Sequence, residues 1–227
     1  MKPLPRLVID ASIAGAAGQS ATPTSKHCRD FLETVQTMNY PVALPPPLLD
    51  EWRKHATKSA RIWLVRMLSK PRRFVDEVPE SPKLRREIEE AALQGLARKL
   101  QGQAKQVVMS KWGIVPDKVE KSPNLQRKIE EAAAPRVVEE SQRQKVLAAM
   151  RKDFHLLEAA LATDKRVISR DEMVHRFFHY ATAEVNAIKS IVWVNPMEGA
   201  TAIVWLEKNA KAERKRMLDR EPAAILE

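Results

Sequence analysis

The sequence predicts an α/β protein with a parallel sheet, interrupted by a large helical segment. Short apolar runs typical of buried strands alternate with longer stretches of helical periodicity towards both ends of the chain. The chain has only 6 glycines in 227 residues, which disfavours a turn-rich all-β fold. Residues 72–152, between the two α/β parts, have a helical pattern and no convincing strand.

The composition is that of an ordinary globular protein, with 44% apolar and 30% charged residues. The single cysteine, Cys28, cannot form an internal disulfide, which suits a reducing compartment. The apolar stretch near the N-terminus does not resemble a secretory signal, and no apolar run approaches the length of a membrane span. We therefore expect a cytoplasmic protein with no membrane partner.

The first α/β part begins with Leu7–Ile9, a continuous apolar run that predicts a buried parallel strand, followed by Asp10. Residues 11–24 are small and polar, and we predict a loop there. Apolar residues at helical spacing predict a helix over 25–38, and a second short strand is expected over 40–44.

We predict that one helix follows, from Pro47 to a stop at Pro71. Its apolar stripe consists of Leu48, Trp52, Ala56, Ala60, Trp63 and Met67. Its polar positions are one-sided in charge, because the stretch between Trp52 and Arg73 has no acid and eight basic residues: Arg53, Lys54, Lys58, Arg61, Arg66, Lys70, Arg72 and Arg73. Solvated helix faces usually mix both signs, so this stripe indicates a track for nucleic-acid phosphates.

The middle of the chain reads as a basic helical insertion. Residues 72–152 hold 18 Lys and Arg against 12 Asp and Glu, a surplus of +6 out of the net charge of +10. Two segments resemble each other, Ser81–Ala92 and Ser122–Ala133, and each begins with serine and proline, a typical helix start. We predict one α/β domain formed by 1–71 and 145–227, with 72–144 inserted into it.

The second α/β part repeats the alternation of helices and strands. Its strands are expected to be apolar at their centres, and Asp171 follows the first of them. The predicted elements are a helix over 145–162, a strand over 166–170, a helix over about 172–187, a strand over 191–194 and a basic helix over 201–218.

Four acids are expected to meet at one edge of the sheet. Asp10 and Asp171 each follow a strand, and ligands of parallel sheets bind at the carboxyl ends of the strands. Glu51 lies in the first turns of the helix after the second strand, and Asp153 flanks the buried stripe of a later helix. Each acid alone has an ordinary explanation as a turn residue, a helix cap or a solvated side chain. Their arrangement favours a shared cation site.

These segments resemble the PIN-domain ribonucleases. The resemblance rests on Val8-Ile9-Asp10-Ala11-Ser12, on Pro47-Leu48-Leu49-Asp50-Glu51, on the run from Asp153 to Ala162, and on Arg166-Val167-Ile168-Ser169-Arg170-Asp171. Val194-Asn195-Pro196 resembles the family's closing strand. The resemblance covers about 1–70 and 145–200 and implies a three-layer α/β/α fold.

The resemblance also implies a site. Its metal ligands and catalytic acids would be Asp10, Glu51, Asp153 and Asp171, with supporting hydroxyls at Ser12 and Ser169. Asp50 and Glu172 adjoin two of these acids and are alternative ligands. Carboxylate oxygens suit Mg²⁺ or Mn²⁺, and such ions can activate water for phosphodiester hydrolysis.

The sequence therefore predicts a Mg²⁺- or Mn²⁺-dependent endoribonuclease that holds RNA with Arg53, Lys54, Lys58 and Arg61. The alternative is a non-catalytic RNA-binding or assembly protein that keeps the PIN-like fold. The family resemblance implies a homodimer, and a protein inhibitor or antitoxin is a further kind of partner.

Overall fold

The computed structural model describes residues 3–69, 78–114, 116, 119, 122–133 and 140–221. Its sheet has four parallel strands in the order β2-β1-β3-β4. The strands are β1 (Leu7–Ile9), β2 (Val42–Ala43), β3 (Arg166–Ile168) and β4 (Val192–Val194). The predicted α/β class with a parallel sheet is confirmed, and all four predicted strands are present.

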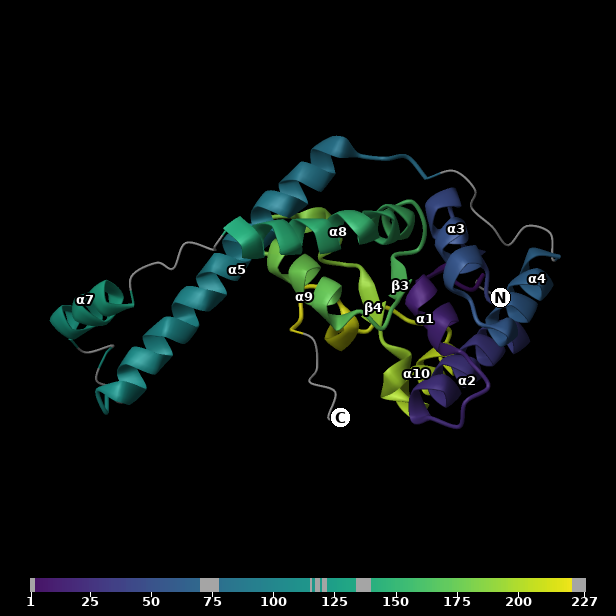
Figure 1. Cartoon of the computed structure of the whole chain (residues 1–227), viewed down its shortest axis with the longest axis horizontal. Helices are drawn as coiled ribbons and strands as arrows, with labels where there is room; N and C mark the ends of the chain where they lie inside the picture. Colours follow the sequence, from purple (N-terminus) through teal and green to yellow (C-terminus); the bar gives the residue numbers. More distant parts are fainter. Residues whose placement is uncertain are drawn as a thin grey trace.

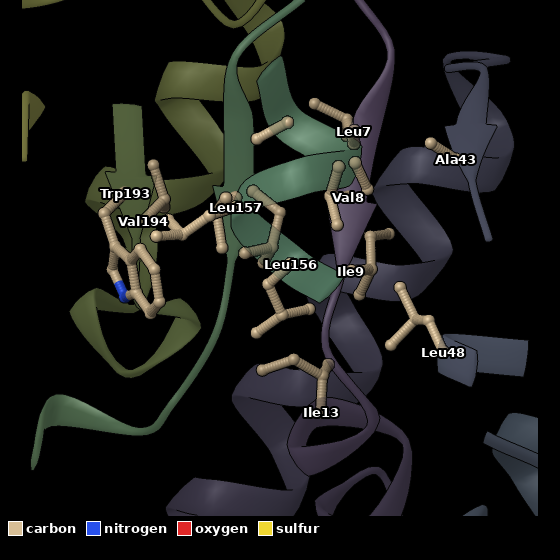
Figure 2. Close-up of a cluster of buried hydrophobic side chains, with 14 of the residues drawn as sticks. Leu7, Val8, Ile9, Ile13, Ala43, Leu48, Leu156, Leu157, Trp193 and Val194 are labelled. Carbon is tan, nitrogen blue, oxygen red and sulfur yellow. The ribbon is translucent and has the colours of Figure 1, made fainter. Parts of the chain in front are cut away.

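The strands are short, with two or three residues each, and they are largely buried. Every residue of β1, β2 and β4 is buried, so their side chains alternate between two apolar layers. In the centre of the sheet, β1 pairs with β3 at Val8↔Val167 and Ile9↔Ile168. Figure 2 shows Leu156 and Leu157 among the side chains of the central strands. These contacts hold α8 against β1 and β3, the two strands that precede Asp10 and Asp171.

The helices form groups that are compatible with a three-layer α/β/α arrangement. Helix α8 packs on α9 and contacts β1 and β3, whereas α2 packs on α1, α4 and α10 (Figure 1). The α-helices are α1 (Ala11–Ala16), α2 (Pro23–Thr37), α3 (Pro46–His55), α4 (Lys58–Leu68), α5 (Pro82–Lys111), α7 (Pro123–Ala132), α8 (Glu140–Leu161), α9 (Glu172–Ala181) and α10 (Ala200–Glu207). None of the helices in the described ranges is both long and apolar enough to cross a membrane.

Two predictions for the N-terminal part were wrong. The expected loop over 11–24 contains α1, because the side chain of Asp10 caps this helix and Ile13 and Ala14 enter the core. The expected single helix from Pro47 is two helices, because Ala56 is extended and Thr57 caps α4. The hydroxyl of Thr57 also donates to the carbonyl of Ala17 at 2.8 Å, so a tertiary contact fixes the break. The predicted stop at Pro71 lies outside the described residues.

The two C-terminal helices are shorter than predicted. Helix α9 ends at Ala181, and a short 3₁₀ helix follows at Asn186–Ile188. Helix α10 ends at Glu207, because Asn209 and Ala210 have positive φ angles of 62° and 47° that no α-helix accommodates. The basic residues that follow α10 are therefore not on a helix continuous with it. Helix α8, by contrast, begins at Glu140, five residues before the predicted start.

The described part of the helical insertion is attached to the α/β body through the first half of α5. Ile88, Ala92 and Leu96 of this half are buried in the core, and the second half runs away from the sheet towards α7 (Figure 1). An ion pair ties the start of α5 to α8, since Arg85 donates to the buried carboxylate of Glu158 at 2.8 and 2.6 Å. Ser81 and Ser122 are the N-caps, as the sequence predicted, although neither side chain makes a capping hydrogen bond.

A glycine permits the close packing of α5 on α9. A Cβ atom added at Gly95 would lie 2.7 Å from both the Cβ atom and the backbone oxygen of Tyr180. Backbone atoms of α9 cannot move aside without shifting the helix, so the contact requires glycine at this position. Gly102, further along α5, has no heavy atom within 4 Å of its added Cβ.

We expect Gly95→Ala to lower the free energy of unfolding by about 1–3 kcal/mol, because overpacking outweighs the better helix propensity of alanine. Gly102→Ala is the matched control and should leave stability unchanged or raise it by up to about 1 kcal/mol. Urea unfolding of both variants measures the difference. Equal stabilisation by the two substitutions would contradict the close packing of α5 on α9.

Candidate functional site

The predicted acids lie where the strand order changes direction. The chain moves from β1 outward to β2, then returns across the sheet to β3 and β4, so the strand order reverses between β1 and β3, which is where parallel sheets typically bind ligands. Asp10 follows β1 and Asp171 follows β3, while α3 contributes Glu51 and α8 contributes Asp153. One carboxylate oxygen from each of Asp10, Glu51 and Asp153 lies within 4.8 Å of the others.

Two hydroxyl groups orient the carboxylate of Asp10. Ser12 Oγ and Ser169 Oγ donate to the same oxygen, Oδ2, at 2.5 and 2.6 Å. Both hydroxyls are themselves held by the chain after β3, since the amide of Arg170 donates to Ser12 Oγ and that of Asp171 to Ser169 Oγ. The two serines predicted as supporting hydroxyls therefore contact the first acid and join the ends of β1 and β3.

Asp171 lies beside the triad and not within it. Its Oδ1 accepts a hydrogen bond from the amide of Val174 at 2.9 Å, which makes it the N-cap of α9. Its charge nevertheless acts on the triad, because it contributes to raising the pKa of Asp153. The structure thus brings three of the four predicted acids together and places the fourth at their margin.

Asp153 carries the strongest electrostatic perturbation of the four. Its side chain is buried, and desolvation is the main cause that raises its pKa to about 7. The negative charges of Asp10, Asp171 and Glu51 act in the same direction, and nearby Lys152 opposes them weakly. Near neutral pH this carboxyl group is therefore partly protonated in the metal-free protein, and a bound cation would replace the proton.

A histidine that sequence reasoning did not identify adjoins the triad. His155 Nε2 lies 3.7 Å from Glu51 Oε2, is buried, and has no hydrogen-bond partner among the described residues. Burial lowers the pKa of His155, while the neighbouring charges of Glu51 and Asp10 act in the opposite direction. Periodicity could not reveal this residue, because all residues of α8 from Asp153 to Ala160 are buried.

The two alternative ligands lie outside the triad. Asp50 points to solvent with 74% of its side chain exposed and pairs with Arg53 at 3.2 Å. Glu172 accepts a hydrogen bond from Asn195 at 3.3 Å, and it lines a cavity with His175 and Trp193. Glu51 and Asp171 are therefore better placed than their neighbours to act on a shared cation.

The basic residues predicted to bind RNA lie on the last turn of α3 and the first turns of α4. Arg53, Lys54, Lys58 and Arg61 are all exposed and lie two to ten residues after Glu51 in the chain. Arg61 also donates to the carbonyl of Ala56 at 3.0 Å. Three further basic residues of the predicted stripe, Lys70, Arg72 and Arg73, lie outside the described residues.

The donor set of the triad suits a hard divalent cation. Carboxylate oxygens are the preferred ligands of Mg²⁺ and Mn²⁺, and the shared repulsion that raises the pKa of Asp153 is relieved when a cation binds. Among the described residues, the triad is the one group of three or more acids, histidines or cysteines close enough to share an ion. This cluster can hold a metal ion, and its donors do not by themselves select one metal.

Comparison of the chain with protein-family models, with curated proteins and with solved structures finds no match. The fold and the acid triad consequently rest on the geometry alone.

The raised pKa of Asp153 makes the stability of the metal-free protein depend on pH. The folded state binds this proton up to about pH 7 and the unfolded state only to about pH 4, so stability falls as the pH rises between these values. We expect Asp153→Asn to stabilise the metal-free protein at pH 8 by on the order of 2–4 kcal/mol, and by much less near pH 4.

Thermal and urea unfolding in a chelator, over this pH range, measure the effect. Asp50→Asn is the control and should change little, since Asp50 is exposed. If Asp153→Asn is no more stable than the wild type at pH 8, the pKa of Asp153 is not raised in the folded protein.

Proposed function

We propose that the chain is a metal-dependent nuclease with a PIN-like fold, and that its substrate is RNA. The observation that carries this proposal is the triad of Asp10, Glu51 and Asp153 at the carboxyl edge of the sheet, in which the two aspartates are buried and Glu51 is half-buried. Three carboxyl groups packed together cost free energy, through mutual repulsion or through the proton that Asp153 retains, and a structural role would not require them to share one position. Binding a divalent cation offsets that cost and serves hydrolysis of a phosphodiester.

In this proposal the acids bind the cation and the serines orient one of the acids. Asp10, Glu51 and Asp153 would hold Mg²⁺ or Mn²⁺, which supplies charge for the phosphate and an acidified water. Ser12 and Ser169 keep the Asp10 carboxylate in one orientation, so little rearrangement is needed when a cation binds.

Proton transfer would fall to Asp171, the acid at the margin of the triad. Asp171 lies where a carboxylate can accept a hydrogen bond from an attacking water, because only its Oδ1 is used in capping α9.

RNA is the substrate that the charge distribution supports. Arg53, Lys54, Lys58 and Arg61 are exposed and follow Glu51 along the chain, so phosphates held by these side chains pass close to the triad. The order of the acids along the chain and their positions after β1 and β3 support the resemblance to the PIN-domain ribonucleases. The resemblance to that family implies cleavage that leaves a 5′-phosphate and a 3′-hydroxyl.

The direct test is cleavage of a mixed-sequence single-stranded RNA in the presence of Mn²⁺. We expect Asp10→Asn and Glu51→Gln each to lower the cleavage rate by at least about 100-fold, because each removes a ligand oxygen from the triad. Asp50→Asn is the matched control, since it alters the neighbouring exposed acid, and it should retain activity.

Metal-independent cleavage, or activity that survives both ligand substitutions, would contradict the nuclease proposal. If RNA binds tightly in a salt-dependent manner and no variant or wild-type protein cleaves it, the chain is instead the non-catalytic RNA-binding protein of the alternative prediction.

A further inference from the structure

Arg170 lies at the carboxyl end of β3, directly between Ser169 and Asp171. Its backbone amide donates to Ser12 Oγ at 3.3 Å, and its guanidinium donates from Nη1 to the Ser12 carbonyl at 3.4 Å. Ser12 Oγ in turn donates to Asp10 Oδ2 at 2.5 Å. One residue therefore separates the guanidinium from the Asp10 carboxylate, which keeps the two groups within about 10 Å of each other.

Among the described residues Arg170 has no carboxylate partner, although it is half-buried. The long hydrogen bond to Ser12 uses one of its five guanidinium hydrogens. Nε is buried without a partner, and Nη2, which has none either, keeps access to solvent. Charges that are taken out of water are normally paired, so the terminal N–H groups of Arg170 are open to an anion that the described protein does not supply.

The electrostatic effects of Arg170 place its guanidinium at the margin of the acid triad. Burial raises the pKa of the Cys28 thiol to about 11, and the charge of Arg170 acts in the opposite direction, so the guanidinium lies towards α2. The charged groups that act on the pKa of Asp153 do not include Arg170. Arg170 is therefore close to the triad without being its counter-ion.

Basic side chains thereby flank Asp10 on both sides in the order of the sheet. The strand that leads to Asp10, β1, lies between β2 and β3. Arg53 and Lys54 belong to α3, the helix after β2, whereas Arg170 follows β3. An RNA strand with one phosphate at the triad therefore meets the basic end of α3 on one side and Arg170 on the other.

We propose that Arg170 binds the phosphate next to the phosphodiester that is cut. The inference rests on the proposed nuclease function, because it places this phosphate relative to the metal-binding acids. A guanidinium suits the task, since its planar fork can donate to two phosphate oxygens at once. Phosphate contacts fix the register of a strand without reading its bases, so Arg170 is a positioning residue and does not select a sequence.

The first experiment measures binding without cleavage. A single-stranded uridine RNA is titrated in Ca²⁺ at several salt concentrations with the wild type and with Arg170→Gln. We expect the variant to bind roughly tenfold or more weakly at low salt, because a charge-assisted hydrogen bond is lost. The slope of log affinity against log salt should become shallower by about 0.7, which corresponds to one phosphate contact on a single strand.

Two further variants separate this contact from general effects of charge and folding. Arg170→Lys keeps the positive charge, so it should restore the salt slope even though it cannot donate as a fork. Arg143→Gln is the matched control, since it removes the same charge from an exposed position in the first turn of α8, and it should bind like the wild type. Wild-type affinity and slope in Arg170→Gln, the same loss in Arg143→Gln, or no RNA binding by the wild type would overturn the proposal.

A modified substrate tests the position of the contact in the wild-type protein and does not depend on the folding of any variant. A uridine RNA carries one neutral methylphosphonate linkage, with a 2′-O-methyl group beside it for chemical stability, and its cuts are mapped in Mn²⁺. We expect the wild type to cut the bond on one side of this linkage more slowly than the same bond in an RNA that carries the 2′-O-methyl group alone, because Arg170 loses its anion. Equal rates at the neighbouring bonds of the two RNAs would contradict the proposed position.

Kinetics of Arg170→Gln complete the test. The variant should raise KM with a smaller change in kcat, since it removes binding that is present before the transition state, and it should no longer distinguish the two RNAs. A shallower salt slope without any cleavage would leave the Arg170 contact standing and remove the nuclease proposal. Metal-dependent cleavage with an unchanged salt slope in Arg170→Gln would do the reverse.

Discussion

Repulsion among buried carboxylates is the constraint on which the rest of this site depends. Asp10 and Asp153 are almost fully buried, Glu51 is half-buried, and each offers an oxygen within 4.8 Å of the others. The stress is concentrated on Asp153, whose pKa rises to about 7 because it has little access to water and three negative neighbours. The surrounding fold holds these carboxyl groups together, and two parts of the fold contribute most directly.

The first of these parts is the junction of β1 and β3. The pairing of Ile9 with Ile168 brings the ends of two strands together that are 159 residues apart in the chain, and Ser169 then donates to Asp10 across the junction. The second part is α8, which is buried on all sides near Asp153 and contacts both strands. Burial of apolar neighbours, at about 25 cal/mol per Å², stabilises the helix and so offsets the cost of the acid that it carries.

Much of this arrangement follows from the sequence by simple rules. The apolar runs that end in Asp10 and Asp171 predict strands whose carboxyl ends meet, and the helical spacing around Asp153 predicts that it borders the core. These residues could be identified because strand and helix periodicities leave a direct mark on the order of apolar residues. These rules do not predict the two serines that support Asp10. Only the family resemblance predicts them.

Other features depend on tertiary contacts that no local pattern records. The break between α3 and α4 requires Thr57 to bond to Ala17, and the termination of α10 requires positive φ angles at two residues. His155 could not be found because a helix buried on every side has no polar face that sets one residue apart. The sequence left both roles open for Asp171, since a ligand and a helix cap occupy the same position after a strand, and the structure shows the cap of α9.

The central claim is that the triad binds a divalent cation, and anomalous diffraction from crystals grown with Mn²⁺ tests it most directly. The account predicts a single strong peak about 2.1–2.2 Å from carboxylate oxygens of Asp10, Glu51 and Asp153, close to the octahedral distances of such ions. A structure in which Mn²⁺ is absent from the triad at saturating concentration, with the three carboxylates still together, would contradict it.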